Sequence, residues 1–502
     1  MNHYYLLFPV LLPVLAGILL LLIPFKNRKN MLRLISLILT VHLACALLIF
    51  VHQEQEMSLS LTYITGSLHL YFDVDMLSKI FMLLISFIWL MAALAAFEYM
   101  LHEKDEHRFF GFYLIVEGVL TALCFSGNLF TMYVFYELMT LTSVPLVMHT
   151  MDHEAVMAGL KYLFYSIGGA FMVLFGFFVF TAQGNGLYFT PGGVLDNADP
   201  SAVTLGAVFL MILGFGTKAG MFPLHGWLPT AHPVAPAPAS AVLSGIITKA
   251  GVLGIIRSVY YIAGPDLIRG TWVQYAWAGL ALVTVILGSM LAYKENVLKK
   301  RLAYSTVSQV SYVLFGLSML HPVAFVGALL HVVFHALVKN TLFISAGAII
   351  CKTGKTKVNQ LTAIGREMPV VMRCFTVASL TLVGIPPTSA FVSKWLLATG
   401  ALEADIPLFS WLGPVILLVS AVLTAGYLLS ISIRGFFPGE GYNDSLTEKR
   451  EPSWMMLVPL VVMAVLSVVF GIWPTGLENL ITDSIVSPVL LMGGRSLCSL
   501  FL

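Results

Sequence analysis

Seven titratable side chains lie inside strongly apolar stretches of this sequence, and their chemistry is its most informative feature. They are one glutamate, four lysines and two histidines: Glu137, Lys218, Lys249, His331, His335, Lys339 and Lys394. A lysine at the centre of a membrane-spanning helix costs about 2.5–3.5 kcal/mol on insertion scales, so such residues are rare and usually functional. A row of buried groups that bind and release protons predicts a protein that moves protons or cations.

Glu137 and Lys218 carry opposite charges. A lone buried carboxyl group becomes protonated because loss of water disfavours its charged form, whereas a nearby lysine allows both groups to stay charged. Lys218 lies between glycines and shortly before Pro223. Glycine and proline allow a membrane helix to break where the freed backbone lines a polar cavity. We therefore expect a coupled pair, with a protonated Glu137 that only satisfies a neighbouring helix as the alternative.

His331, His335 and Lys339 follow one another at intervals of four residues. This spacing places them on one helix face along about 12 Å. A neutral imidazole both donates and accepts, so it can hand on a proton. A histidine pair at this spacing can also bind zinc, but a lysine is next in line and no acidic ligand is near. We therefore expect a proton relay, no metal and no cofactor, with Lys249 as a further relay lysine rather than a packing residue.

Lys394 follows the pair Pro386 and Pro387, which predicts a second broken helix. Two broken helices, one in each half of the chain, indicate an internal repeat of the kind that secondary transporters use. His225 and His232 lie in the proline-rich segment 223–239, a candidate re-entrant segment, where a relay role and a plain loop role both stay open. Glu117 is a further carboxyl group in the middle of an expected helix. It is an accessory candidate, and the sequence assigns it no role.

The composition defines the class of protein. Of the 502 residues, 59% are hydrophobic and 10% are charged, whereas soluble domains carry about 25% charged residues. The chain is therefore predicted to be an all-α polytopic membrane protein, and its net charge of +2 does not suggest a nucleic-acid partner. The five cysteines form no closely spaced pair, so no iron–sulfur cluster or disulfide framework is expected.

A membrane helix needs about 20 apolar residues. This length predicts about fourteen helices, with an uncleaved first helix: 4–25, 31–51, 77–100, 109–126, 129–148, 158–182, 203–222, 240–263, 272–293, 302–320, 322–350, 374–398, 408–434 and 454–473. The loop 52–76 is expected to form a hairpin. The expected domains are the first three helices, two five-helix units, and a last helix with a short tail: 1–108, 109–263, 272–434 and 435–502.

The basic residues alternate between the two sides of this arrangement. Lysines and arginines concentrate in the segments 26–33, 101–108, 294–301 and 351–373, whereas the intervening loops are mostly acidic. Because the cytoplasmic loops of membrane proteins carry the excess of Lys and Arg, we expect these segments inside. The protein would then be a multi-pass protein of the cell (inner) membrane with both termini outside.

Four motifs at these titratable residues resemble a known superfamily. They occupy 133–139, 216–232, 334–343 and 384–395, and contain Glu137, Lys218, Lys339 and Lys394. The chain resembles the antiporter-like membrane subunits of respiratory complex I, of Mrp-type cation/proton antiporters (the D-type subunit in particular) and of membrane-bound hydrogenases. The resemblance extends over roughly 70–435.

The resemblance implies fourteen helices with two inverted five-helix repeats. It implies that Glu137 and Lys218 are a coupled acid–lysine pair, Lys249 a connecting lysine and Lys394 the outward terminal group, with the 331–339 face as the central relay. Other membrane subunits and the lipid bilayer are the implied partners, and the transported ion is H+, with Na+ as a further possibility. No catalytic chemistry of its own is expected. Three functions stay open: a redox-driven proton pump subunit, a sodium/proton antiporter subunit, and a passive membrane scaffold.

Overall fold

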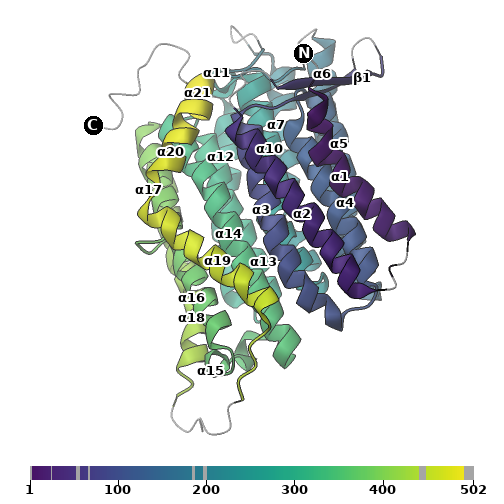
Figure 1. Cartoon of the computed structure of the whole chain (residues 1–502). Coiled ribbons are helices and arrows are strands. Elements are labelled where there is room, and N and C mark those ends of the chain that lie inside the picture. The colour runs from purple at the N-terminus through teal and green to yellow at the C-terminus, as the bar shows by residue number, and fades with distance from the viewer. Residues whose placement is uncertain are drawn as a thin grey trace.

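The protein folds as a bundle of long helices. The computed structural model describes residues 3–23, 25, 27–52, 57–65, 68–183, 187–195, 200–439 and 448–490. In this part of the chain, twelve helices are long and apolar enough to cross a membrane. They stand side by side, with a short sheet at one end of the bundle (Figure 1). The expected all-α polytopic membrane fold is confirmed.

The first half of the chain contains both strands of the described structure. Its elements are η1 (Tyr4–Leu6), α1 (Leu7–Leu22), α2 (Arg28–Val51), β1 (Ser58–Tyr63), β2 (His69–Asp73), α3 (Met76–Tyr99), η2 (Met100–His102), α4 (Glu106–Phe125), α5 (Leu129–Val147), α6 (His153–Ala182), α7 (Ala202–Ala219), α8 (Leu228–Val234), α9 (Ala237–Val242), η3 (Leu243–Ile247), α10 (Thr248–Ile256) and η4 (Arg257–Ala263).

The second half contains no named strand among its described residues. Its elements are α11 (Pro265–Ile268), α12 (Trp272–Lys294), α13 (Leu298–Ser318), α14 (Pro322–Thr353), η5 (Val358–Gln360), α15 (Ile364–Glu367), α16 (Pro369–Val383), α17 (Ser389–Glu403), α18 (Phe409–Phe436), α19 (Trp454–Ile472), α20 (Thr475–Ile481), η7 (Thr482–Val486) and α21 (Ser487–Leu490).

Two of the expected spans are helical but are not among the twelve. The expected span 302–320 is α13, which begins with basic residues and is rich in serine, and the expected span 374–398 falls on α16 and α17. The long span expected at 322–350 is the unbroken 32-residue helix α14. The inverted symmetry of the two five-helix units stays a prediction.

Both expected helix breaks are present, and each begins at a glycine. Gly220 caps α7 with φ of 81° and Gly384 caps α16 with φ of 92°. This left-handed conformation costs glycine little, because glycine lacks the Cβ that would clash. After the first break, the proline-rich segment forms the short helix α8, which packs against α6 and α13. The segment 223–239 thus contains α8 and the beginning of α9, and its re-entrant position in the membrane stays a prediction.

The helix that follows, from Ala237 to Ala263, contains two π-helical stretches, η3 and η4. The last turn of a helix leaves carbonyl groups without partners inside the helix. At η4, these carbonyl groups accept hydrogen bonds from the loop that precedes α7. The amides of Thr190, Gly192 and Val194 donate to Tyr261, Tyr260 and Ile262 at 3.1, 3.0 and 2.9 Å. The loop therefore fixes the end of this central helix.

The two ends of the bundle differ. The expected hairpin is confirmed: β1 and β2 form an antiparallel pair, and they lie at the same end as η1 (Figure 1). The short helix α15, within the basic segment 351–373, lies at the opposite end (Figure 1). The hairpin and this basic segment thus lie at opposite ends of the bundle, as expected from the alternation of basic and acidic loops. Which end faces the inside of the cell stays a prediction.

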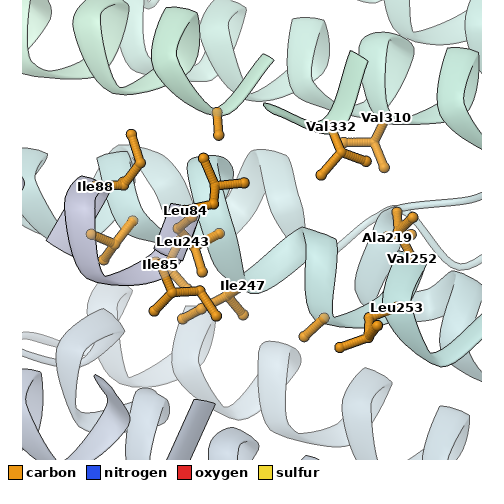
Figure 2. Packing of buried hydrophobic residues seen from close by; sticks show 14 of the residues in the cluster. Leu84, Ile85, Ile88, Ala219, Leu243, Ile247, Val252, Leu253, Val310 and Val332 are labelled. Carbon is orange, nitrogen blue, oxygen red and sulfur yellow. The ribbon is translucent and has the colours of Figure 1, made fainter. Parts of the chain in front are cut away.

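Four of the seven titratable residues lie on the two most deeply buried spans: Lys249, His331, His335 and Lys339. In the most apolar stretch of the helix Ala237–Ala263, 100% of the residues are buried inside the protein. The buried share of the corresponding stretch is 89% in α14 but only 33% in α2 and in α19. Figure 2 shows the apolar packing of this region, with Leu84 of α3, Leu243 of η3, Leu253 of α10, Val310 of α13 and Val332 of α14. The central helices thus place polar side chains inside an apolar core.

Candidate functional site

Lys218 lies in the last turn of α7 and is fully buried. Its ammonium group Nζ donates to three hydroxyl groups: Thr140 of α5 at 2.9 Å, Tyr162 of α6 at 2.8 Å and Ser166 of α6 at 2.8 Å. Nζ also lies 4.1 Å from the centre of the Tyr162 ring, a cation–π distance. All three donors of the ammonium group are therefore satisfied by neutral partners.

Glu137 lies three residues before Thr140 on α5 and is half-buried. Its carboxylate and the Lys218 ammonium group interact electrostatically, but they form no ion pair within 4.0 Å in the described structure. The hydroxyl groups that surround Nζ explain the absence of a direct contact. An opposite charge favours ionisation at a separation of about 4–6 Å, and we predict that the two side chains of the expected coupled pair approach each other to this range.

Lys249 joins the central helix to α14. It lies on α10, is 2% exposed, and its Nζ donates to the carbonyl oxygen of Ser244 at 2.6 Å. The same Nζ lies 2.7 Å from Nδ1 of His335. This contact between an amine and an imidazole nitrogen links the side chains of the two helices directly.

The histidine face of α14 points into the protein, as expected. His331 is 0% exposed and His335 is 1% exposed. Their rings stack with centroids 5.9 Å apart, and Nδ1 of His331 lies 2.9 Å from the Ser393 hydroxyl on α17. Nε2 of each ring has no hydrogen-bond partner among the described residues. The contacts therefore lead from Lys249 through both histidines to α17.

Lys339 differs from the expected arrangement. It is fully buried on the same face of α14, but its Nζ turns toward α13, where it donates to the carbonyl oxygen of Leu302 at 3.1 Å and to the hydroxyl of Ser305. The partner that touches His335 is Lys249. The regular spacing predicted the shared face correctly, but it did not predict this turn, because α13 supplies the acceptors.

Lys394 lies on α17, after the second helix break. Its Nζ donates to the carbonyl oxygens of Leu382 and Val383 at 2.6 and 3.2 Å. These are carbonyl groups at the end of α16, where the helix dipole is negative. Nζ also lies 4.9 Å from the centre of the Tyr312 ring. The break therefore forms a cation site from the backbone.

In the described structure, the three accessory candidates form no hydrogen bond with the relay residues. The His232 ring stacks on Phe343 of α14 with centroids 4.8 Å apart, and neither of its nitrogens has a hydrogen-bond partner in the described structure. His225 lies in the turn before α8, with its ring near that of Phe222. Glu117 contacts a residue that the sequence analysis did not select: its Oε1 lies 2.9 Å from Nδ1 of His42 on α2, and both side chains are fully buried.

Sequence reasoning also missed the hydroxyl groups around Lys218 and the buried cation Arg257. Tyr162 and Ser166 are one turn apart on α6, and this polar pair in an apolar helix was a usable signal. Arg257 forms a two-bond ion pair with Asp75, at 2.6 and 2.7 Å. Among the described residues, no group of three or more His, Cys, Asp or Glu side chains could hold a metal ion.

The fold and these contacts define a polytopic membrane protein whose interior carries titratable groups on five helices, α5, α7, α10, α14 and α17, of which α7 and α17 adjoin the two helix breaks. The chain belongs to the family described as NADH:quinone oxidoreductase/Mrp antiporter, TM, whose model matches residues 126–425.

Similar proteins come from several branches of this family. The chain is 32% identical to NADH-quinone oxidoreductase subunit N of Desulforudis audaxviator over 80% of this chain and 81% of that protein. It is 27% identical to the D-type subunit of the Na(+)/H(+) antiporter of Bacillus subtilis over 97% of this chain and 98% of that protein. Its fold is similar to that of a chain in the structure of the Mrp complex from Dietzia sp. DQ12-45-1b, with a TM-score of 0.83, 21% identity and 97% coverage of both chains.

Proposed function

We propose that this protein is a proton-translocating membrane subunit of a multisubunit complex, in which protons move between Lys218 and Lys394. The observation that carries the proposal is the 2.7 Å contact between Lys249 and His335, which connects the central helix to the histidine face of α14. A passive scaffold would not need a buried amine beside a buried imidazole, because each polar group at this depth is costly.

The charge of Glu137 controls the first step. A buried ammonium group without a counter-charge is unfavourable, so loss of the Glu137 charge, or its movement away, favours release of the Lys218 proton. Lys249 and the two imidazoles then pass a proton on, since a neutral imidazole can accept on one nitrogen and donate from the other. Lys394 receives it, and the carbonyl groups at the end of α16 stabilise the resulting charge.

The driving force comes from a partner, either an electron-transferring arm or an opposing sodium gradient. The relatedness to a quinone oxidoreductase subunit N supports the first. The match to the D-type subunit of an Na(+)/H(+) antiporter along nearly the whole of both chains supports the second, in which Na+ is exchanged for H+. In both cases the partners are other membrane subunits.

Proton flux in vesicles tests the function. The complete complex, with its partner subunits, is assayed in inverted membrane vesicles with a pH-sensitive dye, driven once by a redox donor and once by a sodium gradient. Lys249→Ala should abolish the flux. The control is Lys300→Ala, because Lys300 forms a surface ion pair with Glu295 at 2.9 Å and is outside the relay. Normal flux in Lys249→Ala would reject the proposed path.

The proposed location is the cell membrane, with both termini outside. Lys294 is exposed at the end of α12, and Tyr63 is exposed on β1, at the hairpin end of the bundle. In a cysteine-free complex, Lys294→Cys should react with an impermeant thiol reagent from the inside only, and Tyr63→Cys from the outside only. The reverse labelling pattern would invert the orientation.

A further inference from the structure

An apolar groove lies between α2 and α19, outside the relay. Here called the α2–α19 groove, it has a volume of about 300 Å³. Its walls also include α3, α14 and α20, and Figure 1 shows α3 and α14 between α2 and α19. All of its lining side chains are Leu, Ile, Val or Phe, among them Leu47, Phe50, Leu83, Phe87, Leu337 and Phe470. None of these residues was selected from the sequence.

The dimensions of the α2–α19 groove fit a single hydrocarbon chain. Its lining extends from Leu43 to Phe50 along α2 and from Ile80 to Phe87 along α3, which is about 10 Å in each helix at 1.5 Å per residue. A volume of about 300 Å³ over this length corresponds to a width of about 6 Å, whereas an α-helix with its side chains is about 10–12 Å wide. The groove is therefore too narrow to hold a helix of another subunit.

The apolar walls also exclude water as the occupant. They offer water no hydrogen-bond partner, and purely apolar cavities stay dry. An empty space of this size would deprive its lining of van der Waals contacts. Leu47 is 48% exposed on α2, so the groove opens at the side of the bundle, where the lipid bilayer lies. Lipid hydrocarbon therefore has both the chemistry and the access to fill it.

A buried lysine lies at the hairpin end of the groove. Lys79, in the first turn of α3, is 6% exposed. It lies one helix turn before Leu83 and two turns before Phe87, which places it on the face of α3 that lines the groove. Its Nζ donates to the carbonyl oxygen of His52 at 2.6 Å, two residues after Phe50. The ammonium group thus lies where α2 and α3 close this end of the groove.

The charge of Lys79 is not neutralised by a direct ion pair among the described residues. An ammonium group has three donors, and the printed acceptor of Lys79 in the groove wall, the His52 carbonyl, is neutral. Asp75 acts on Lys79 electrostatically, but both of its oxygens are bound by the guanidinium group of Arg257, at 2.6 and 2.7 Å. Lys79 is therefore suited to bind a further anion.

We propose that the α2–α19 groove binds one phospholipid from the leaflet at the hairpin end. One acyl chain fills the groove, and the phosphate group accepts a hydrogen bond from Lys79. A phosphodiester is an anion with strong acceptor oxygens, and hydrogen bonds between two charged groups are stronger than neutral ones. In a phospholipid, this anion lies directly above the hydrocarbon, as Lys79 lies directly above the groove. The inference goes beyond the proposed function and does not depend on it.

The bound chain lies behind the relay. Val333 and Leu337 line the groove, and each is two residues from His335, which places them on the opposite side of α14. A phospholipid at this place completes the packing of the helix that carries both histidines. Two competing interpretations are that hydrocarbon of any kind fills the groove, and that a partner subunit covers it.

Photo-crosslinking of the complete complex tests the site without a transport assay. The complex, purified in a nonionic detergent, is incubated with a phosphatidylglycerol whose acyl chain carries a diazirine, and mass spectrometry locates the adduct. We expect adducts on Leu83, Phe87 or Leu337. Excess unlabelled phosphatidylglycerol should lower this labelling at least fivefold, whereas diacylglycerol, which has the same chains but no phosphate, should not. Equal competition by the two lipids, or a wild-type groove without adducts, would overturn the proposal.

A lysine variant tests the phosphate contact. Lys79→Met should lower the labelling of the groove at least fivefold, and Lys79→Arg should retain it, because arginine keeps the charge and the donors. The control is Lys29→Met, since Lys29 is exposed at the opposite end of α2. Full labelling of the groove in Lys79→Met would reject a phospholipid held by this lysine.

A pair of neighbouring leucines tests the groove itself, and it decides the question if Lys79→Met does not assemble. Leu47→Trp should block the groove and lower its labelling at least fivefold. Leu48→Trp is the matched control, because Leu48 is 72% exposed and does not line the groove. Equal labelling in the two tryptophan variants would overturn the site. Loss of proton flux in the wild-type complex would reject the proposed function but would leave these labelling results unaffected.

Discussion

The two broken helices stabilise their lysines in opposite ways. Lys218 precedes its break, in the last turn of α7, and its charge is surrounded by side-chain hydroxyls of other helices. Lys394 follows its break, and its charge faces the backbone carbonyls that the break leaves at the end of α16. The same local feature, a glycine-capped interruption, thus yields one site that depends on its neighbours and one that the backbone itself forms.

This difference indicates separate roles for the two lysines. Neutral hydroxyls provide weaker compensation for a charge than an ionised group does, so the proton on Lys218 is sensitive to the state of Glu137. The end of a helix carries a fixed partial negative charge, so Lys394 does not need a carboxylate. The first site is therefore suited to regulated release and the second to steady acceptance of a proton.

The largest expected effect is that of Glu137→Gln. If the charge on Lys218 depends on this carboxylate, its removal should lower driven proton flux at least about tenfold, which corresponds to about 1.4 kcal/mol. Assembly of the complex should be unchanged, because Glu137 is half-buried and makes no ion pair in the described structure. Flux in vesicles and the amount of assembled complex are the two measurements. Glu154→Gln, at an exposed position at the start of α6, is the control.

The cage around Lys218 gives the next prediction. Tyr162→Phe removes one acceptor of the ammonium group but keeps the ring under it. A hydrogen bond to a charged group contributes about 1.5–3 kcal/mol, so flux should fall about tenfold and thermal stability should fall with it. Tyr275→Phe on α12 is the matched control, since its ring packs on Phe409 and Tyr275 is away from the cage. A Tyr162→Phe complex with unchanged flux would mean that Lys218 does not depend on its hydroxyl partners.

The glycines at the breaks give a third, paired prediction. Both positions have the left-handed backbone that strains alanine, which costs about 1 kcal/mol. A Cβ at Gly220 would also lie 2.4 Å from Leu228, whereas one at Gly384 would meet the flexible Lys394 side chain at 3.1 Å. Gly220→Ala should therefore lower the melting temperature more than Gly384→Ala does, but Gly384→Ala should affect flux by displacing Lys394. A larger stability loss at Gly384 would contradict this order.

The sequence predicted the helix spans, both breaks and the buried lysines, because each follows from a local rule: apolar length, glycine and proline, or the cost of a charge in lipid. It did not predict which groups the lysines contact. Thr140 and Ser166 resemble many other hydroxyl residues in the chain, and only the packing of α5 and α6 against α7 selects them. The pair His42–Glu117 was missed for the same reason, since α2 and α4 are adjacent only in the folded protein.

The smallest effect on transport is expected at another buried cation, Arg257. It extends the comparison because, unlike Lys218 and Lys394, it forms a direct ion pair with a carboxylate. It lies at the end of the helix that carries Lys249, and its guanidinium group is bound by Asp75 at 2.6 Å. Burial raises the pKa of Asp75, but the Arg257 charge and the hydrogen bonds of Arg257 and Ser78 outweigh this, so that the pKa is lowered overall. A buried cation that is permanently paired with a carboxylate should stabilise the fold and should not take part in proton transfer.

Asp75→Asn should therefore lower the stability of the complex, by about 1–3 kcal/mol for the loss of a charged hydrogen-bond acceptor, and leave the flux of the remaining folded complex unchanged. The sign of the pH dependence follows from the lowered pKa. The ion pair contributes fully above the unfolded-state pKa of about 3.9 and is lost as the pH falls through the lower folded-state value. The melting temperatures of the wild type and of Asp75→Asn, measured from pH 7 to pH 3, should thus differ by an amount that becomes smaller below about pH 4. If Asp75→Asn instead abolished flux in folded complexes, a tightly paired cation would take part in transport, and the distinction between regulated and fixed cation sites would be wrong.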